Sequence, residues 1–339
     1  MAARSSNSRV DRRHEFLGDH GKEDVNVPAM YTSNALDPQS PQARTIYDLG
    51  IVSGIVFVLI FVIVTGAILY ALFRFRGREG EPEPKQFAGS KNAEIVWTVI
   101  PFLIVVFLFV LTLRAMNQVD PPPAPSPDLV VTGHQFWWQA NYPASGAVTA
   151  NEIHIPAGKP LSVLLDSKDV LHEFWVPKLS RKMTTVPGQA NHLWLQADKP
   201  GVYIGQCSEF CGTQHAWMRI LVVAEEPSKF EQWQQAQLRP SRTPTSDLAA
   251  KGLALFQTST CINCHVIRGV AGADARVAPD LTHVASRQQL GAGILENTPA
   301  NMRRWLKNPQ HIKPGCLMPD FDLTDQQLDE LGEYLESLR

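Results

Sequence analysis

Hydrophobic residues form two long, nearly unbroken stretches in the first third of the chain, at about residues 49–73 and 95–116. Each stretch is close to the roughly 20 residues that a helix needs to cross the hydrocarbon core of a bilayer. A helix buried in a soluble core normally keeps a polar face, whereas residues 51–72 carry no charge and form no such face. We therefore predict a two-helix transmembrane hairpin over residues 46–118.

The short connection between the two predicted spans is rich in basic residues, namely Arg74, Arg76, Arg78, Lys85 and Lys91. Basic residues in short loops favour the cytoplasmic side, and acidic residues hardly alter this preference. We predict that loop 74–92 is cytoplasmic and that both flanking parts lie on the outer or periplasmic face of the cell (inner) membrane. No apolar segment precedes residue 46, so we expect no cleavable signal peptide and a first span that acts as the signal.

Short alternating segments separated by proline and glycine dominate residues 128–225 and predict an all-β sandwich. The clearest predicted strands are 129–132, 152–155, 161–165, 190–196 and 218–223. A proline-rich stretch over 121–127 precedes them, and we expect it to form a stiff spacer that holds the sandwich off the membrane. Residues 1–45 are polar without helical or strand periodicity, so we expect a flexible N-terminal tail.

The pattern becomes helical after residue 246. Thr324 and Gln327 form a capping box at the start of a final amphipathic helix, and Thr298 with Pro299 begins another that runs to about Lys307. An earlier helix around residues 248–256 has Gly252 on its packing side. We predict an all-α domain over 246–339, joined to the sandwich by a linker over 226–245.

Composition and cysteine spacing narrow the range of functions that the chain could have. The formal net charge is −2 and the pI is near 6.6, so no nucleic-acid partner is expected. Four of the five cysteines form two close pairs, each followed by a histidine. This spacing is more typical of metal or haem sites than of a disulfide framework.

The first pair lies in a segment that places two thiols, an imidazole and a thioether within twelve positions: Cys207, Cys211, His215 and Met218. Such donors suit copper, and two thiolates can bridge a pair of copper ions, with the Glu209 carbonyl as a weak further ligand. A disulfide or a structural zinc site are the alternatives, although zinc does not require the methionine. A second histidine would come from elsewhere in the chain, and spacing alone leaves open His134, His154, His172 and His192.

The second pair forms the C-x-x-C-H pattern of covalent haem c attachment, with Cys261 and Cys264 as thioether donors and His265 as iron ligand. A methionine as sixth ligand would raise the haem potential to suit respiratory electron transfer. Met318, on a loop before the final helix, is the favoured candidate. Met302 is the weaker one because it lies within a predicted helix, and we interpret Cys316 as a small, half-buried residue of the methionine loop.

Residues 46–224 resemble subunit II of cytochrome c oxidases. The segment from Cys207 to Met218 matches every fixed position of that family's dinuclear copper (CuA) loop. The family's first histidine ligand lies in a D-V-x-H segment, which here runs from Asp169 to His172. The resemblance implies a cupredoxin-like sandwich with a CuA ligand set of His172, Cys207, Glu209, Cys211, His215 and Met218.

Two further segments carry the resemblance. Glu94 opens a segment similar to the start of the family's second span. The resemblance implies that Glu94 lies at the cytoplasmic mouth of a proton channel in subunit I. The alternative is that Glu94 is simply an acidic residue at a helix start in the membrane interface. Residues 133–138 resemble the aromatic run over the copper site, so Phe136, Trp137 and Trp138 are expected to accept and transfer electrons. Phe136 replaces the tryptophan that in many relatives receives electrons from soluble cytochrome c, and Thr184 stands where an aspartate is common.

The C-terminal domain resembles class I cytochromes c. In that family a methionine–proline loop, here Met318 and Pro319, supplies the sixth ligand, and a proline carbonyl, here Pro279, holds the ring N–H of the iron-bound histidine. A fused copper subunit and cytochrome c domain resembles the caa3-type branch of haem–copper oxidases.

That branch implies a route for electrons. They would pass from cytochrome c or a cytochrome bc complex to haem c, then to CuA, and then to haem a of subunit I, where dioxygen is reduced to water with proton pumping. Subunit III is a further expected partner. A nitric oxide reductase with a copper-bearing small subunit is the alternative, and a quinol oxidase is less favoured because that branch lacks the copper ligands.

Overall fold

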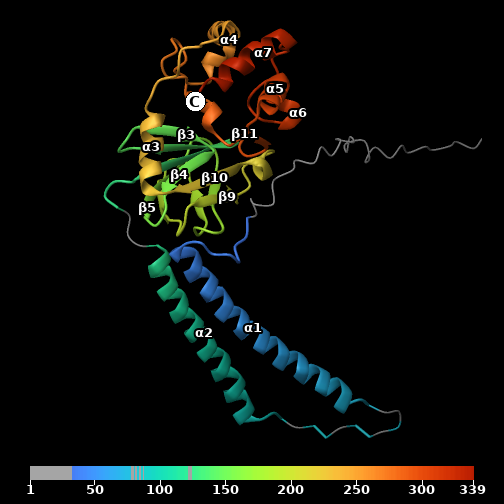
Figure 1. Cartoon of the computed structure of the whole chain (residues 1–339). Coiled ribbons are helices and arrows are strands. Elements are labelled where there is room, and N and C mark those ends of the chain that lie inside the picture. Colours follow the sequence, from blue (N-terminus) through green and yellow to red (C-terminus); the bar gives the residue numbers. More distant parts are fainter. Residues whose placement is uncertain (1–32, 78–79, 81, 84, 87, 121–123) are drawn as a thin grey trace, which may run out of the picture.

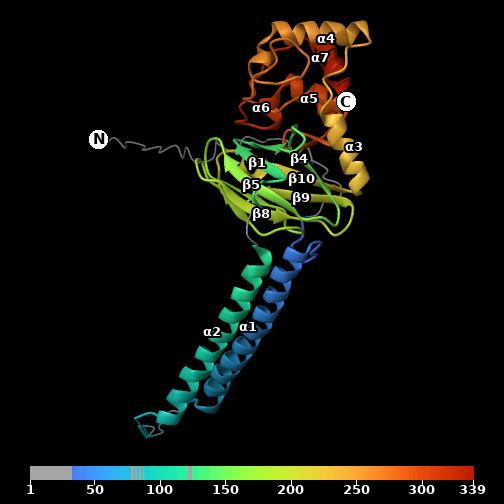
Figure 2. The same ribbon diagram turned by 90° about the vertical axis from the view of Figure 1, so that its left-hand side faces the viewer.

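The structure is a computed structural model that describes residues 33–77, 80, 82–83, 85–86, 88–120 and 124–339. A helical hairpin, a β-sandwich and a smaller, mainly helical domain follow one another along the chain and are stacked in the same order (Figures 1 and 2). The sandwich lies in the middle and contacts both of the other parts.

The hairpin consists of α1 (Pro41–Arg74) and α2 (Lys91–Val119), which are longer than the apolar stretches that predicted them. Ser40 and Ser90 cap their N-termini, because each side-chain oxygen accepts a hydrogen bond from the backbone N–H three residues later. Both helices are long and apolar enough to cross a membrane, and their most apolar windows are exposed. The predicted transmembrane hairpin therefore has its counterpart in the fold.

The end of the predicted flexible tail is instead fixed against the sandwich. The backbone N–H of Gln39 donates to the Lys178 carbonyl at 2.8 Å, and the Ser40 hydroxyl donates to the Leu179 carbonyl at 2.6 Å. Asp37 forms an ion pair with Lys178 at 2.6 Å. Residues 41–45 are already helical, since Pro41 suits the first helical turn. Residues 1–32 lie outside the described part of the chain.

Ten strands form the sandwich as two mixed five-stranded sheets. The first contains β3 (Ala147–Ala150), β2 (Trp137–Tyr142), β1 (Leu129–His134), β5 (Leu161–Ser167) and β8 (Asn191–Leu195). The second contains β4 (Glu152–Pro156), β10 (Arg219–Glu225), β9 (Gly201–Cys207), β6 (His172–Trp175) and β7 (Met183–Thr185). Only β1 with β5 and β4 with β10 pair in parallel. The five predicted strands are β1, β4, β5, β8 and β10.

The stretch expected to be a linker begins with a helix, α3 (Pro227–Gln237). Phe230 and Trp233, three positions apart, share one face of this helix and pack against the sandwich core. Trp233 also stacks on the buried His154 ring, with centroids 4.1 Å apart. The extended connection between the domains is therefore shorter than 226–245, because these two aromatic side chains bind its first half to the sandwich.

The C-terminal domain is built from four α-helices in the order α4 (Asp247–Thr258), α5 (Pro299–Lys307), α6 (Pro309–Ile312) and α7 (Asp325–Glu336). Both bonds of the predicted capping box between Thr324 and Gln327 are present. A two-stranded ribbon, β11 (Gln289–Leu290) with β12 (Leu295–Glu296), is the one strand pair of this otherwise helical domain. The predicted all-α class thus describes the domain apart from four ribbon residues.

Helices α4 and α7 pack so closely that their contact excludes a side chain at Gly252. A Cβ added there would lie 2.7 Å from Cβ of Tyr334 and closer still to the Glu330 carbonyl. Both neighbours belong to α7, and the carbonyl is part of a rigid backbone. The glycine is therefore required by the approach of the two helices.

We predict that Gly252→Ala lowers the free energy of unfolding of the C-terminal domain by roughly 2 kcal/mol, because overpacking outweighs alanine's better helix propensity. Gly332→Ala is the matched control, since among the described residues no atom outside the helix's own backbone lies within 4 Å of a Cβ at that position. It should raise stability by up to about 1 kcal/mol. Thermal unfolding of the two variants would show this, and equal melting temperatures would contradict the tight helix contact.

Candidate copper and haem centres

Pairing of β6 with β9 brings together donors that are far apart in sequence. Phe174 of β6 lies opposite Cys207 of β9, so His172, at the start of β6, lies near the end of β9. The chain then turns through the loop after Cys207 and returns in β10. A hydrogen bond from Cys207 N–H to the Met218 carbonyl, 3.0 Å long, closes this copper loop, residues 207–218.

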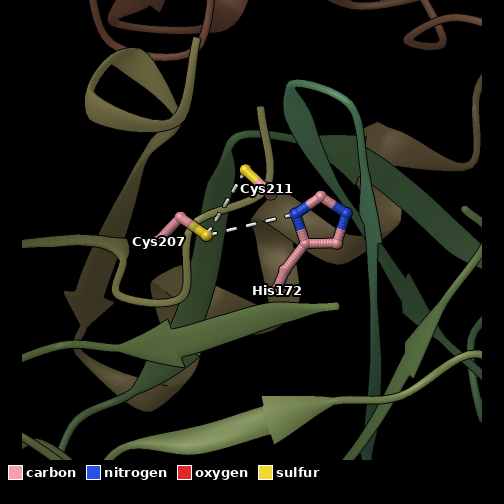
Figure 3. A group of neighbouring side chains, drawn as sticks. All are labelled: His172, Cys207 and Cys211. Atoms are coloured by element: carbon pink, nitrogen blue, oxygen red, sulfur yellow. Dashed lines mark hydrogen bonds between the residues drawn. The ribbon is translucent and has the colours of Figure 1, made fainter. Parts of the chain in front are cut away.

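The side-chain donors of the copper loop converge within van der Waals distance. Sγ of Cys207 lies 3.9 Å from Sγ of Cys211 and 4.0 Å from Nδ1 of His172 (Figure 3). Sγ of Cys211 lies 3.8 Å from both Nδ1 of His215 and Sδ of Met218. Two atoms that share one ion through bonds of about 2.3 Å can be up to about 4.6 Å apart, so these spacings fit shared metal ions.

The sulfur atoms of this site do not form a disulfide. All five cysteines of the chain lie in the described residues and are free thiols, and a disulfide would need the two sulfurs at about 2.0 Å. Met218 is fully buried with its sulfur directed at Cys211. A soft thioether in contact with the thiols is the donor chemistry expected for copper, and structural zinc sites do not use it.

His172 is held in the orientation that a metal ligand needs. Its Nε2 lies 2.8 Å from Oδ1 of Asp169, which leaves Nδ1 facing the sulfurs. The ring is fully buried against the edge of Trp138, and a Cβ at Gly133 would lie 2.7 Å from it. A carboxylate on the far nitrogen is the usual partner of a metal-bound histidine.

The other three candidate histidines have different neighbours. His134 stacks on Trp137 with centroids 4.1 Å apart, and His154 lies between the carboxylates of Glu152 and Glu225. His192 lies 3.4 Å from Asp120 near the end of α2. Of the four, the structure brings His172 to the cysteine sulfurs.

The thiol pair ionises in a way that suits metal binding. The hydrogen bond shared with Cys211 is the largest cause that lowers the pKa of Cys207, to about 4, and the contact with His172 also lowers it. The same shared bond raises the pKa of Cys211. The contact between the two thiols thus favours the thiolate form of Cys207, and the thiolate is the form that binds a metal ion.

The three aromatic residues 136–138 are all buried and differ in what they touch. Trp138 contacts His172 edge-on at a centroid distance of 5.8 Å. The Phe136 ring lies against the copper loop, since a Cβ at Gly212 would be 2.9 Å from it. Trp137 packs with Ala292 of the C-terminal domain. The run thus extends from the candidate copper ligands to the domain interface.

The C-x-x-C-H residues border a cavity at that interface. His265 is oriented by its Nδ1, which lies 2.7 Å from the Pro279 carbonyl, and burial lowers its pKa, so that it is neutral as an iron ligand must be. Cys261, Cys264 and His265 line the cavity together with Pro279. Gln135, Phe136 and Trp137 of the sandwich also line it. Thiols, a histidine and mainly apolar side chains thus line one cavity, which fits a covalently attached haem.

Both candidate methionines reach this cavity. Met318 is half-buried on the loop between α6 and α7, and its carbonyl accepts a hydrogen bond from the Gln310 side chain at 2.6 Å. Met302 belongs to α5 and is buried in the hydrophobic core with 2% of its surface exposed. Cys316 is half-buried, with Sγ 3.3 Å from the same Gln310 amide.

Glu94 lies in the first turn of α2, at the end of the hairpin farthest from the sandwich (Figure 1). Its side chain is exposed, and its backbone carbonyl accepts a hydrogen bond from the Thr98 hydroxyl at 2.8 Å. Thr184 pairs with Glu173 in the β6–β7 ribbon, and its carbonyl accepts a hydrogen bond from Asn191. Neither residue contacts the two candidate centres.

We predict that Asp169→Asn weakens copper binding by about 10-fold to 100-fold, because the amide cannot hold and polarise the His172 ring as the carboxylate does. Asp166→Asn removes the same charge from neighbouring strand β5 and should leave the affinity unchanged. Competition titration against a copper chelator would measure both. Equal affinities in Asp169→Asn and the wild type would show that the contact does not serve the site.

Comparison with known families covers most of the chain. Residues 28–115 match the transmembrane domain of cytochrome c oxidase subunit II, and residues 146–225 match its periplasmic domain. Residues 249–339 match cytochrome c. The three matches follow the order of the hairpin, the sandwich and the C-terminal domain.

Individual relatives extend over nearly the full length. Cytochrome c oxidase subunit 2 of Alkalihalophilus pseudofirmus is 39% identical over 313 residues, 90% of each chain. The protein of that name from Bacillus subtilis is 32% identical over 327 residues, 90% of this chain and 92% of the relative. Quinol oxidase subunit 2 of Bacillus cereus is 34% identical over 205 residues, 58% of this chain and 70% of the relative.

These matches confirm the resemblance noted in the sequence. They indicate a membrane protein with two spanning helices, a copper-binding sandwich and a haem-binding domain. The chain belongs to the cytochrome c oxidase subunit 2 family, as a member with a fused cytochrome c domain.

Proposed function

We propose that this chain transfers electrons within a respiratory cytochrome c oxidase, from a covalently bound haem c to a dinuclear CuA centre and on to haem a of subunit I. The observation that carries the proposal is that both candidate centres adjoin one interface. Phe136 lines the cavity next to His265 and also lies against Gly212 of the copper loop. A short path between two redox centres is what such a subunit requires.

The proposed copper ligands are the side chains of His172, Cys207, Cys211, His215 and Met218, together with the carbonyl of Glu209. The Glu209 carbonyl oxygen lies 3.2 Å from Sγ of Cys207. When bound, the copper pair would take up and release one electron. The sandwich supports this by fixing the donors between β6, β9 and β10, so that the donor positions change little between oxidation states.

The proposed haem ligands are Cys261 and Cys264 as thioethers, with His265 and Met318 on the iron. Pro279 fixes the tautomer and orientation of His265 by accepting its Nδ1–H. Most of the cavity lining is apolar, and a methionine ligand would favour the high potential that respiratory transfer needs. Trp137 and Trp138, in turn, would offer aromatic paths from this cavity toward His172.

The remaining assignments concern the complex as a whole. Subunit I would reduce dioxygen to water and pump protons, with subunit III as a further partner and cytochrome c or a cytochrome bc complex as donor. The sandwich and the cytochrome domain would lie on the outer or periplasmic face of the cell membrane, with loop 74–92 cytoplasmic. Glu94, at the far end of the hairpin, would then lie at the mouth of a proton channel.

We predict that Cys211→Ser abolishes dioxygen uptake by the assembled oxidase while haem c remains reducible, because a bridging thiolate is lost. Ser208→Ala, in the same loop, is the control, since the buried Ser208 hydroxyl has no hydrogen-bond partner among the residues that the structure describes. An oxygen electrode combined with haem absorbance would measure both steps. Persistent dioxygen uptake in Cys211→Ser would show that copper is not on the electron path. Uptake of nitric oxide by the wild type in place of dioxygen would contradict the assignment as an oxidase.

We predict that Met318→Ala lowers the haem potential and opens the iron to carbon monoxide, because the sixth ligand is lost. Met302→Ala should instead lower the free energy of unfolding by about 2–5 kcal/mol through a core cavity, with the iron ligands retained. Redox titration and carbon monoxide binding distinguish these outcomes. Unchanged optical spectra in Met318→Ala would show that another residue binds the iron.

A further inference from the structure

A lysine is buried at the interface between the two soluble domains. Lys313 lies between α6 and Met318, and only 3% of its surface is exposed. Its ammonium group donates to three backbone carbonyls, those of Trp217 at 2.9 Å and of Phe136 and Gly291 at 3.0 Å. An ammonium has three donors, so this set of acceptors satisfies it completely.

The three carbonyls belong to different parts of the proposed electron path. The Trp217 carbonyl is in the peptide bond to Met218, a proposed copper ligand. The Phe136 carbonyl is in the peptide bond to Trp137, which packs on the neighbouring domain. Gly291 belongs to the cytochrome domain, as Lys313 does. One side chain therefore connects the methionine loop of the haem site to the copper loop and to the aromatic run.

Further contacts near Lys313 join the copper loop to the methionine loop. The side-chain amide of Gln214, in the copper loop, donates to the Pro314 carbonyl. A Cβ at Gly315 would lie 2.8 Å from Oγ1 of Thr213, so the glycine allows the close approach. Around this contact, Arg219 N–H donates to the Ala292 carbonyl at 3.1 Å, and Gln288 N–H donates to Oε2 of Glu152 at 2.8 Å.

Burial of an ammonium without a carboxylate partner needs strong compensation, because desolvation of the charge is unfavourable. Lys313 finds it in charge-assisted hydrogen bonds, two of which cross the domain interface. These bonds exist only while the domains are docked. If the interface opened, Phe136 and Trp217 would lose their partner, so the lysine specifically favours the docked arrangement.

We propose that Lys313 is a positioning residue that holds the haem-bearing domain against the copper loop and thereby sets the rate of electron transfer between the two centres. The proposal rests on the function proposed above. In the step concerned, haem iron is oxidised from the ferrous to the ferric state and the copper pair gains that one electron, with no bond or proton transferred. The rate of such a step falls steeply with distance, so loss of the contact should slow it.

The test compares Lys313→Met with Lys251→Met in the purified, assembled oxidase. Methionine keeps the apolar stem of the lysine but cannot donate, and exposed Lys251 on α4 gives the same charge change away from the interface. Haem oxidation by copper is followed by rapid optical spectroscopy. Exchange of the Arg219 and Gln288 amide hydrogens, both bonded across the interface, is followed by mass spectrometry.

Lys313→Met should slow haem oxidation by about tenfold or more and speed exchange at both amides by a similar factor, because the two charge-assisted bonds across the interface are lost. The optical signatures of haem and copper should stay as in the wild type, and Lys251→Met should match the wild type throughout. Wild-type transfer and exchange in Lys313→Met would overturn the proposal.

If Lys313→Met does not fold, a second variant, Lys313→Gln, still tests the proposal. In Lys313→Gln the side-chain amide retains two donors, so partial slowing with faster exchange supports the proposal, and unchanged values overturn it. An error in the proposed function would give a different result from an error in the role of Lys313. The wild type itself would then lack the copper signal or fail to oxidise its haem through copper.

Discussion

The antiparallel pairing of β6 with β9 places Phe174 opposite Cys207, and the two soluble domains depend on that register. It brings His172 to the thiols and fixes where the copper loop begins. The hydrogen bond between Cys207 N–H and the Met218 carbonyl fixes where the loop ends. A slip of one residue would turn Cys207 toward the other face of the sheet and separate it from His172.

The surface on which the cytochrome domain rests is formed by this loop together with the aromatic residues 136–138. Phe136 and Trp217 present carbonyls at the sandwich end, and Trp137 supplies an apolar contact for Ala292. Residues of both domains thereby line the candidate haem cavity, so that neither domain forms its lining alone. The two candidate centres are thus parts of one structure, although their motifs are more than forty residues apart.

Local chemistry was predictable from the sequence, and long-range contacts were not. The capping box at Thr324, the helix face that contains Gly252 and five strands could be read from spacing, because each depends on neighbours in the chain. That Gly252 packs against α7 could not be read in this way. Spacing alone did not show which of four histidines completes the candidate copper site. Family resemblance pointed to His172, and the β6–β9 register shows why this residue contacts the thiols. Strands β2, β3, β6, β7 and β9 lack a clear alternation, and α3 depends on a sandwich surface that only the fold creates. Lys313 carried no sequence signal, since its acceptors are backbone carbonyls from distant segments.

The segment before α1 has a mechanical consequence. Gln39 and Ser40 bind the sandwich at Lys178 and Leu179, while Asp120, just after α2, pairs with Arg181 at 2.8 Å. The sandwich therefore stands on both helices, attached at two points close to its base (Figure 2). A domain on a single tether can swivel about it, whereas one on two tethers cannot turn without breaking contacts at one of them. The two attachments thus fix the orientation of the copper loop relative to the two helices.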